Sequence, residues 1–189
     1  MTAIDRNERE HDGGEVPAGG ALSSATGRLA ATLGERLQAL GLTLATAESC
    51  TGGLVAAAIT AVPGSSAWFS TGLVTYSNEA KIAFLDVRAA TLAAHGAVSE
   101  AVVREMAVGA RSRTGADAAL SVSGVAGPGG GSEAKPVGTV WLGFALPDGS
   151  VEAERHAFPG GRAMVRDAAA RMLLHGILGR LAQPPEKRH

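Results

Sequence analysis

The sequence is poor in cysteine, in aromatic residues and in excess charge. Its single cysteine, Cys50, excludes an internal disulfide framework and a cysteine-rich zinc site. Aromatic residues make up 4% of the chain, too few for a platform that stacks single-stranded nucleic acid. A net charge of -1 argues against a surface built for a phosphate backbone, so we expect no nucleic-acid partner.

Long apolar runs are also missing. The longest such run, residues 54–62, is far below the roughly 20 residues that span a bilayer. The polar amino-terminal segment lacks the apolar core of a signal peptide. We therefore expect a cytoplasmic location and no membrane partner.

Apolar residues reach 46% of the 189 residues, which suits one domain with a substantial core. The two ends are polar and show no periodicity. We therefore predict a disordered tail over 1–24, a single domain over 25–182 and a short tail over 183–189.

Periodicity within that domain predicts alternating helices and strands. Helices are expected at 25–40, from about Thr51 to before Pro63, from Ser77 or Asn78, after Ser99, and over 161–182. Strands are expected at 42–47, 71–76, 117–123, 139–146 and 150–158, the last two flanking the turn sequence Asp148-Gly149. This order predicts an α/β fold, a three-layer α/β/α sandwich with a mixed, mostly parallel sheet and a C-terminal β-hairpin.

The first candidate site follows the strand at 42–47, in the sequence Ala-Glu-Ser-Cys-Thr-Gly-Gly. Ser49 would present its hydroxyl at the carboxyl end of a strand, where open α/β sheets bind ligands. Thr51, Gly52 and Gly53 would offer backbone N–H groups to a phosphate or to a developing oxyanion. Alternatively, Ser49 or Thr51 caps the helix and the glycines form a turn. Cys50 is the competing nucleophile, with a small buried residue as its alternative role.

The second candidate site is Tyr76 with Lys81, about one helical turn apart. The five histidines fall mainly in the tails or in predicted surface elements, which argues against a Ser-His-Asp triad and a metal site. A desolvated lysine can replace histidine as the base, with a tyrosine hydroxyl relaying or orienting the proton. The alternatives are a solvated Lys81 and a half-buried Tyr76 at the end of the sheet.

A glycine-rich loop over 124–131 follows the strand at 117–123. Its candidate ligand-binding residues are Gly124, Gly127, Gly130 and Ser132, with Lys135 nearby. Such a loop is entropically costly unless its backbone wraps a ligand, and a phosphate or ribose is the natural choice. The GK[ST] ending of a P-loop is missing, and a flexible surface loop is the alternative.

Two arginines, Arg162 and Arg166, lie one turn apart near the start of the last predicted helix. Either guanidinium could reach a phosphate or a carboxylate. The alternative is that both are surface residues or pair with Asp167 and neighbouring acids.

Together, the segments TAESCTGG, GSSAWFSTGLVTYSNEAK, GAVSE and SGVAGPGGGSEAKPVGTVW resemble the signature blocks of the CinA carboxyl-terminal domain family, the nicotinamide-nucleotide amidohydrolases. The resemblance runs from about Leu29 to Leu181. It implies hydrolysis of nicotinamide mononucleotide to nicotinate mononucleotide and ammonia, a homo-oligomer, and neither cofactor nor metal. Ser49 matches the family's proposed nucleophile, and Tyr76 and Lys81 match its partners in a Ser-Tyr-Lys arrangement.

The chain departs from the family pattern in two ways. We expect no counterpart of the larger amino-terminal domain that many relatives carry, so we expect only the amidase function to carry over. Gly129 stands where a polar or acidic residue is more usual, which affects the placement of the substrate. Two other functions stay open: a non-catalytic nucleotide-binding or regulatory module, and an amidase acting on another small amide.

Overall fold

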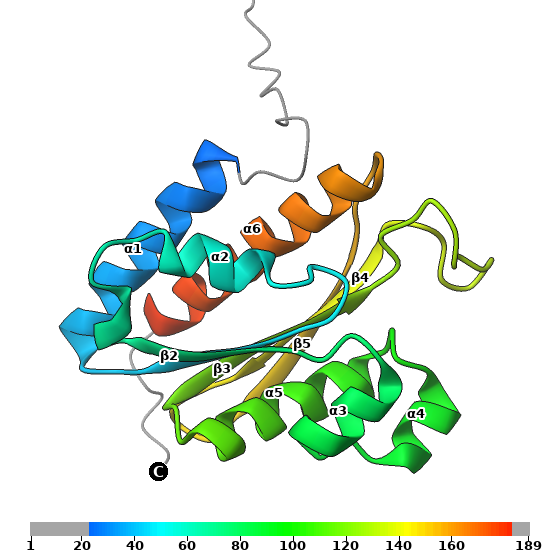
Figure 1. Ribbon diagram of the computed structural model, residues 1–189, viewed down its shortest axis with the longest axis horizontal. Coiled ribbons are helices and arrows are strands. Elements are labelled where there is room, and N and C mark those ends of the chain that lie inside the picture. The colour runs from blue at the N-terminus through cyan, green and yellow to red at the C-terminus, as the bar shows by residue number, and fades with distance from the viewer. Residues whose placement is uncertain (1–22, 183–189) are drawn as a thin grey trace, which may run out of the picture.

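The computed structural model describes residues 23–182, which form one five-stranded sheet covered by helices on both faces (Figure 1). The strands are β1 (Leu44–Glu48), β2 (Phe69–Val74), β3 (Ala118–Gly124), β4 (Thr139–Ala145) and β5 (Val151–Ala157), in the order β2-β1-β3-β4-β5. β2, β1 and β3 pair in parallel, while β4 pairs antiparallel with both β3 and β5. Four strands therefore run in one direction and β4 runs against them.

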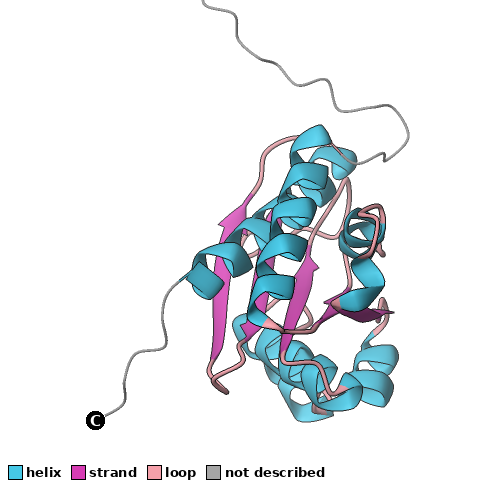
Figure 2. Cartoon of the chain, turned by 90° about the vertical axis from the view of Figure 1, so that its left-hand side faces the viewer, coloured by secondary structure: helices cyan, strands magenta, loops and turns pink. Residues whose placement is uncertain are grey.

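The helices divide into two layers (Figures 1 and 2). One layer holds α1 (Ser24–Leu40), α2 (Leu54–Thr60) and α6 (Arg162–Ala182), with the short 3-10 helix η1 (Ser65–Ala67) leading into β2. The other holds α3 (Asn78–Leu85), α4 (Ala89–His95) and α5 (Glu100–Thr114). Each layer buries its own apolar cluster against the sheet, and Leu33, Leu37 and Leu173 belong to the larger one.

Local sequence signals set most helix ends. A serine side chain accepts a hydrogen bond from the first turn of three helices: Ser23 for α1, Ser77 for α3 and Ser99 for α5. Left-handed glycines, Gly41 and Gly115, end α1 and α5. These signals place α3, and with it Lys81, directly after β2.

The predicted three-layer fold and its mixed sheet are confirmed, with differences at some boundaries. α2 begins at Leu54 instead of near Thr51, because Gly52 and Gly53 have φ of +60° and +94° and form a turn. β2 ends at Val74, so Tyr76 lies beyond the strand. α4 was not predicted. Of the expected amino-terminal tail, Ser23 caps α1 and Ser24 begins it, and the rest of both predicted tails lies outside the described residues.

The strand directions bring several chain segments to one edge of the sheet. β1, β2, β3 and β5 all end there, so the segments after them, 49–53, 75–77, 125–138 and 158–161, lie at the same edge. Most candidate residues lie in these segments, while Gly124 ends β3 and Lys81, Arg162 and Arg166 lie in the first turns of the helices that follow. None of the helices within residues 23–182 is both long and apolar enough to cross a membrane.

The close packing of α5 on α3 at Gly109 can be tested by substitution. A Cβ on Gly109 of α5 would lie 1.9 Å from the carbonyl oxygen of Leu85, the last residue of α3. We expect Gly109→Ala to lower the free energy of unfolding by about 1–3 kcal/mol, measured by urea titration.

Gly27 of α1 is the matched control, because a Cβ there meets nothing within 4 Å. Gly27→Ala should raise stability by about 0.5–1 kcal/mol, the difference in helix propensity. Equal effects of the two substitutions would contradict close packing at Gly109.

Candidate functional site

Ser49 is fixed at the centre of the sheet edge, immediately after β1. Its N–H donates to the carbonyl of Val122 at 3.0 Å, which extends the pairing of β1 with β3 by one residue. The Ser49 side chain is buried, and its Oγ lies 3.0 Å from the Nζ of Lys81. The serine and the lysine singled out from the sequence are therefore in contact.

Lys81 lies in the first turns of α3 with its side chain turned inward and only 1% exposed. Besides Ser49 Oγ, its Nζ meets the backbone carbonyls of Thr75, Tyr76 and Ser77, at 2.9, 3.1 and 3.4 Å. Among the ion pairs of residues 23–182, none includes Lys81. The amine is thus held by dipoles instead of a carboxylate.

Burial lowers the pKa of Lys81 below its ordinary value of 10.5, because desolvation disfavours the ammonium form. Nearby acidic groups, Cys50 and then Glu79, oppose this shift. A neutral amine has two N–H groups for the two nearest carbonyls and a lone pair that can accept from the Ser49 hydroxyl. The arrangement therefore suits a lysine that removes a proton from Ser49.

Tyr76 faces a different neighbour. Its side chain is 59% exposed, and its hydroxyl accepts a hydrogen bond from Nη2 of Arg162 at 2.9 Å. Nη1 of Arg162 donates to the carbonyl of Gly127 at 2.9 Å. Arg162 thus bridges the segment after β2 to the glycine-rich loop, while only the backbone carbonyl of Tyr76 reaches Lys81.

The amino terminus of α2 is already occupied by a side chain. Glu48, buried at 1% exposure, accepts from the N–H groups of Gly53, Val55 and Ala56. The N–H of Gly52 donates to the carbonyl of Ser49. The amides of Gly52 and Gly53, expected to face an anion, are therefore engaged within the protein.

Thr51, in the middle of this turn, keeps unpaired polar groups. Within the described chain its N–H has no hydrogen-bond acceptor, and its fully buried Oγ1 has no partner either. Its carbonyl accepts from Arg166, through Nη2 at 2.6 Å and Nε at 3.2 Å. Arg166 thereby holds the turn from α6.

Cys50 is buried between these groups. Burial, with a smaller contribution from the nearby Glu48 carboxylate, raises the pKa of its thiol to about 12. The thiol is therefore protonated at neutral pH, which argues against a standing Cys50 thiolate as the competing nucleophile.

The glycine-rich loop needs glycine at two positions, one for close approach to backbone and one for its backbone conformation. A Cβ on Gly124 would lie 2.8 Å from the carbonyl oxygen of Thr139, and Gly127 has φ of +82°. Beyond them the loop is exposed at Gly130 and Ser132. Ser132 forms a local turn with Lys135, whose Nζ donates to the carbonyl of His95 at the end of α4. No hydrogen bond within residues 23–182 joins Ser132 or Lys135 to Ser49, Lys81 or Arg162.

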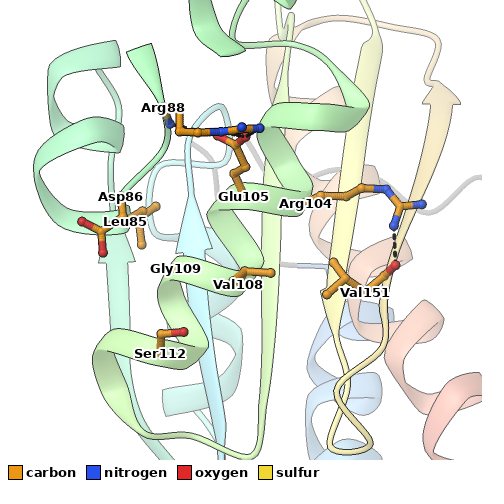
Figure 3. A pocket seen from close by; sticks show the side chains of 9 residues that line it. All are labelled: Leu85, Asp86, Arg88, Arg104, Glu105, Val108, Gly109, Ser112 and Val151. Carbon is orange, nitrogen blue, oxygen red and sulfur yellow. Dashed lines mark hydrogen bonds and ion pairs between the residues drawn. The ribbon is translucent and has the colours of Figure 1, made fainter. Parts of the chain in front are cut away.

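Two other features complete the description. Within residues 23–182, no cluster of three histidine, cysteine or acidic side chains could hold a metal ion. A hollow on the α5 side, away from Ser49, has its charged groups already paired, as between Arg88 and Glu105 and between Arg104 and the carbonyl of Val151 (Figure 3).

Glu48 is the site residue whose binding to the start of α2 was not predicted from the sequence. Its signal was an acidic residue shortly before a helix amino terminus.

Comparison with known proteins gives consistent matches. The CinA C-terminal domain matches residues 26–181. The nicotinamide-nucleotide amidohydrolase PncC of Escherichia coli (strain K12) is 55% identical over 150 residues, covering 79% of this chain and 91% of that protein. A CinA-like protein of Citrifermentans bemidjiense is 62% identical over 131 residues, covering 69% of this chain and 31% of that longer protein.

Solved structures are similar to this chain in both fold and sequence. The competence/damage inducible protein CihA from Agrobacterium tumefaciens has a TM-score of 0.83 and 42% identity, covering 86% of this chain and 99% of that chain. A CinA superfamily protein from Klebsiella pneumoniae 700603 has a TM-score of 0.80 and 44% identity, covering 83% of this chain and 98% of that chain. With both the sequence and the fold matched over nearly the whole described region, the chain belongs to the CinA C-terminal domain family.

Proposed function

We propose that the protein hydrolyses the carboxamide of nicotinamide mononucleotide to nicotinate mononucleotide and ammonia. The observation that carries this proposal is the 3.0 Å contact between Ser49 Oγ and the buried, carboxylate-free amine of Lys81. The reaction and substrate come from relatives named nicotinamide-nucleotide amidohydrolase, which this chain covers almost entirely.

Acylation would begin with neutral Lys81 taking the proton of the Ser49 hydroxyl. Oγ attacks the carboxamide carbon, and the N–H of Thr51 is an unpaired backbone donor of the turn that can stabilise the oxyanion. The carbon–nitrogen bond then breaks. Ammonia leaves with the proton that Lys81 had taken, and an ester to Ser49 remains.

Deacylation would reverse the proton transfers. Water attacks the ester carbon while Lys81 takes one of its protons, and Oγ leaves and recovers that proton. Tyr76 is proposed as the acid-base partner of Lys81. Its hydroxyl is held by Arg162 at the exposed rim, where it can orient the amide or the leaving ammonia.

The nucleotide would lie across the sheet edge, with its phosphate toward the glycine-rich loop and Arg162. Four of the expected binding residues, Gly124, Gly127, Gly130 and Ser132, belong to that loop, and Arg162 contacts the carbonyl of Gly127. Gly52 and Gly53 would shape the turn under the amide instead of donating to it. The homo-oligomeric state and the cytoplasmic location stay predictions.

Removal of the nucleophile is the first test. Ser49→Ala should lower kcat for ammonia release by at least about 1,000-fold while the protein stays folded. Cys50→Ala is the matched control, because its protonated thiol takes no part and the variant should keep near-normal turnover. A wild type that binds the nucleotide but releases no ammonia would instead favour a non-catalytic binding module.

The pH dependence of kcat/KM tests the state of Lys81. Because the neutral amine is the base and burial lowers its pKa, activity should rise with pH and level off at a pH below 10.5. Lys81→Arg, which cannot lose its proton, should be inactive throughout. A wild-type profile that falls as pH rises would contradict a lysine base.

Substrate comparison tests recognition of the phosphate. The enzyme should prefer nicotinamide mononucleotide to its riboside and to free nicotinamide, and Arg162→Ala should reduce the preference over the riboside about tenfold or more. Arg28→Ala, on the exposed face of α1, is the control and should leave that preference unchanged. Equal activity on all three compounds would favour an amidase for another small amide.

A further inference from the structure

Glu48 is a buried carboxylate next to the proposed nucleophile, and the mechanism above gives it no part. Its Oε2 accepts from the N–H groups of Gly53 and Val55 at 3.0 and 3.1 Å, and its Oε1 accepts from that of Ala56 at 2.8 Å. The side chain is 1% exposed. Both carboxylate oxygens are therefore used, and all three donors belong to the start of α2.

This carboxylate has no cationic side chain opposite it. None of the ion pairs among residues 23–182 includes Glu48. A buried carboxylate without such a partner is expensive unless hydrogen bonds stabilise it. Three backbone N–H groups and the positive end of the helix dipole supply that stabilisation.

The main chain of Glu48 is fixed as firmly as its side chain. The residue ends β1 in the middle of the sheet, paired with Val74 on one side and Val122 on the other. Its carbonyl accepts from the N–H of Thr75, whose own carbonyl holds the amine of Lys81. Glu48 thus connects the sheet, the start of α2 and the segment around Lys81.

The turn that carries Ser49 follows Glu48 in the chain, and its last residue is hydrogen-bonded to the Glu48 side chain. Residues 49–53 run from the end of β1 to the N–H of Gly53, which the same carboxylate accepts. The turn is therefore closed on a single residue. The same turn carries Ser49, whose Oγ lies 3.0 Å from Nζ of Lys81.

We propose that Glu48 is a positioning residue that holds Ser49 within reach of Lys81, and that its carboxylate closes the amino terminus of α2 to anionic groups of the substrate. This proposal rests on the proposed role of Ser49 as nucleophile. Glu48 touches neither the reacting atoms nor the amine of Lys81. Its loss should therefore lower the maximal rate while the pH at which the rate levels off stays the same.

Glu48→Gln is the primary test, because it keeps the shape but turns an NH₂ group toward backbone N–H donors. Glu48→Asp keeps the charge on a shorter side chain. Ser99→Ala is the matched control, since Ser99 also caps a helix, α5, from a buried position outside the site. Two rates would be measured for each variant: ammonia release from nicotinamide mononucleotide, and labelling of Ser49 by a small fluorophosphonate.

We expect Glu48→Gln to lower kcat and the labelling rate about 10- to 100-fold, as a small misplacement of the nucleophile does. KM should change less than about threefold, and the pH midpoint of labelling should match the wild type. Glu48→Asp should restore part of the rate. Ser99→Ala should lower the melting temperature without changing either rate.

The two readouts separate this proposal from the proposed function. Labelling of Ser49 in the wild type without ammonia release would refute the proposed substrate while leaving the labelling comparison valid. Wild-type labelling rates in folded Glu48→Gln would overturn the positioning role. So would a shifted pH midpoint, failure of both variants to fold, or a wild-type Ser49 that the reagent does not label.

Discussion

The site depends on one contact, the burial of the Lys81 amine between Ser49 Oγ and the backbone carbonyls at the start of α3. Those carbonyls belong to the chain as it leaves β2, so the amine is placed by the same backbone that ends the strand. Ser77 caps α3, and Gly109 lets α5 pack against the last residue of that helix. The geometry of the proposed base is therefore a consequence of the packing of one helical layer on the sheet.

The other charged groups around Ser49 are also satisfied by backbone atoms. The Glu48 carboxylate accepts hydrogen bonds from N–H groups at the start of α2. Arg166 donates to the carbonyl of Thr51, and Arg162 donates to the carbonyl of Gly127. A charge held by backbone dipoles keeps its place when neighbouring side chains move. This pattern fixes the turn from two sides while leaving the Thr51 amide unpaired, which is the donor that the proposed mechanism needs.

Much of this arrangement could be predicted from the sequence because its signals are local. The periodic leucines of α1, the serine caps and the Asp148-Gly149 turn gave the elements, and their alternation gave the layers. The distance between Ser49 and Lys81 could not be predicted, since it depends on the parallel pairing of β1 with β2. The part of Glu48 was missed because its position shortly before a helix suggests an interaction with the helix start but does not show which N–H groups its side chain will reach. Similarly, nothing local distinguishes Tyr76, with its hydroxyl on Arg162, from a tyrosine that faces the nucleophile.

The lack of a carboxylate beside Lys81 separates this site from one built on a histidine. A neutral histidine can act as a base at physiological pH without burial, whereas a lysine needs a depressed pKa. A carboxylate in contact with Nζ would stabilise the ammonium and cancel the effect of burial. Carbonyl oxygens carry only a partial negative charge, so they hold the amine in place while favouring the ammonium form less strongly than a carboxylate would. Glu48 is the nearest residue in sequence to Ser49 that carries a carboxylate. Three hydrogen bonds hold that carboxylate at the start of α2. Side chains alternate across β1, so Glu48 faces the layer of α2, whereas Lys81 lies in the layer of α3 on the other face of the sheet. The carboxylate nearest in sequence to Ser49 is therefore kept apart from the proposed base.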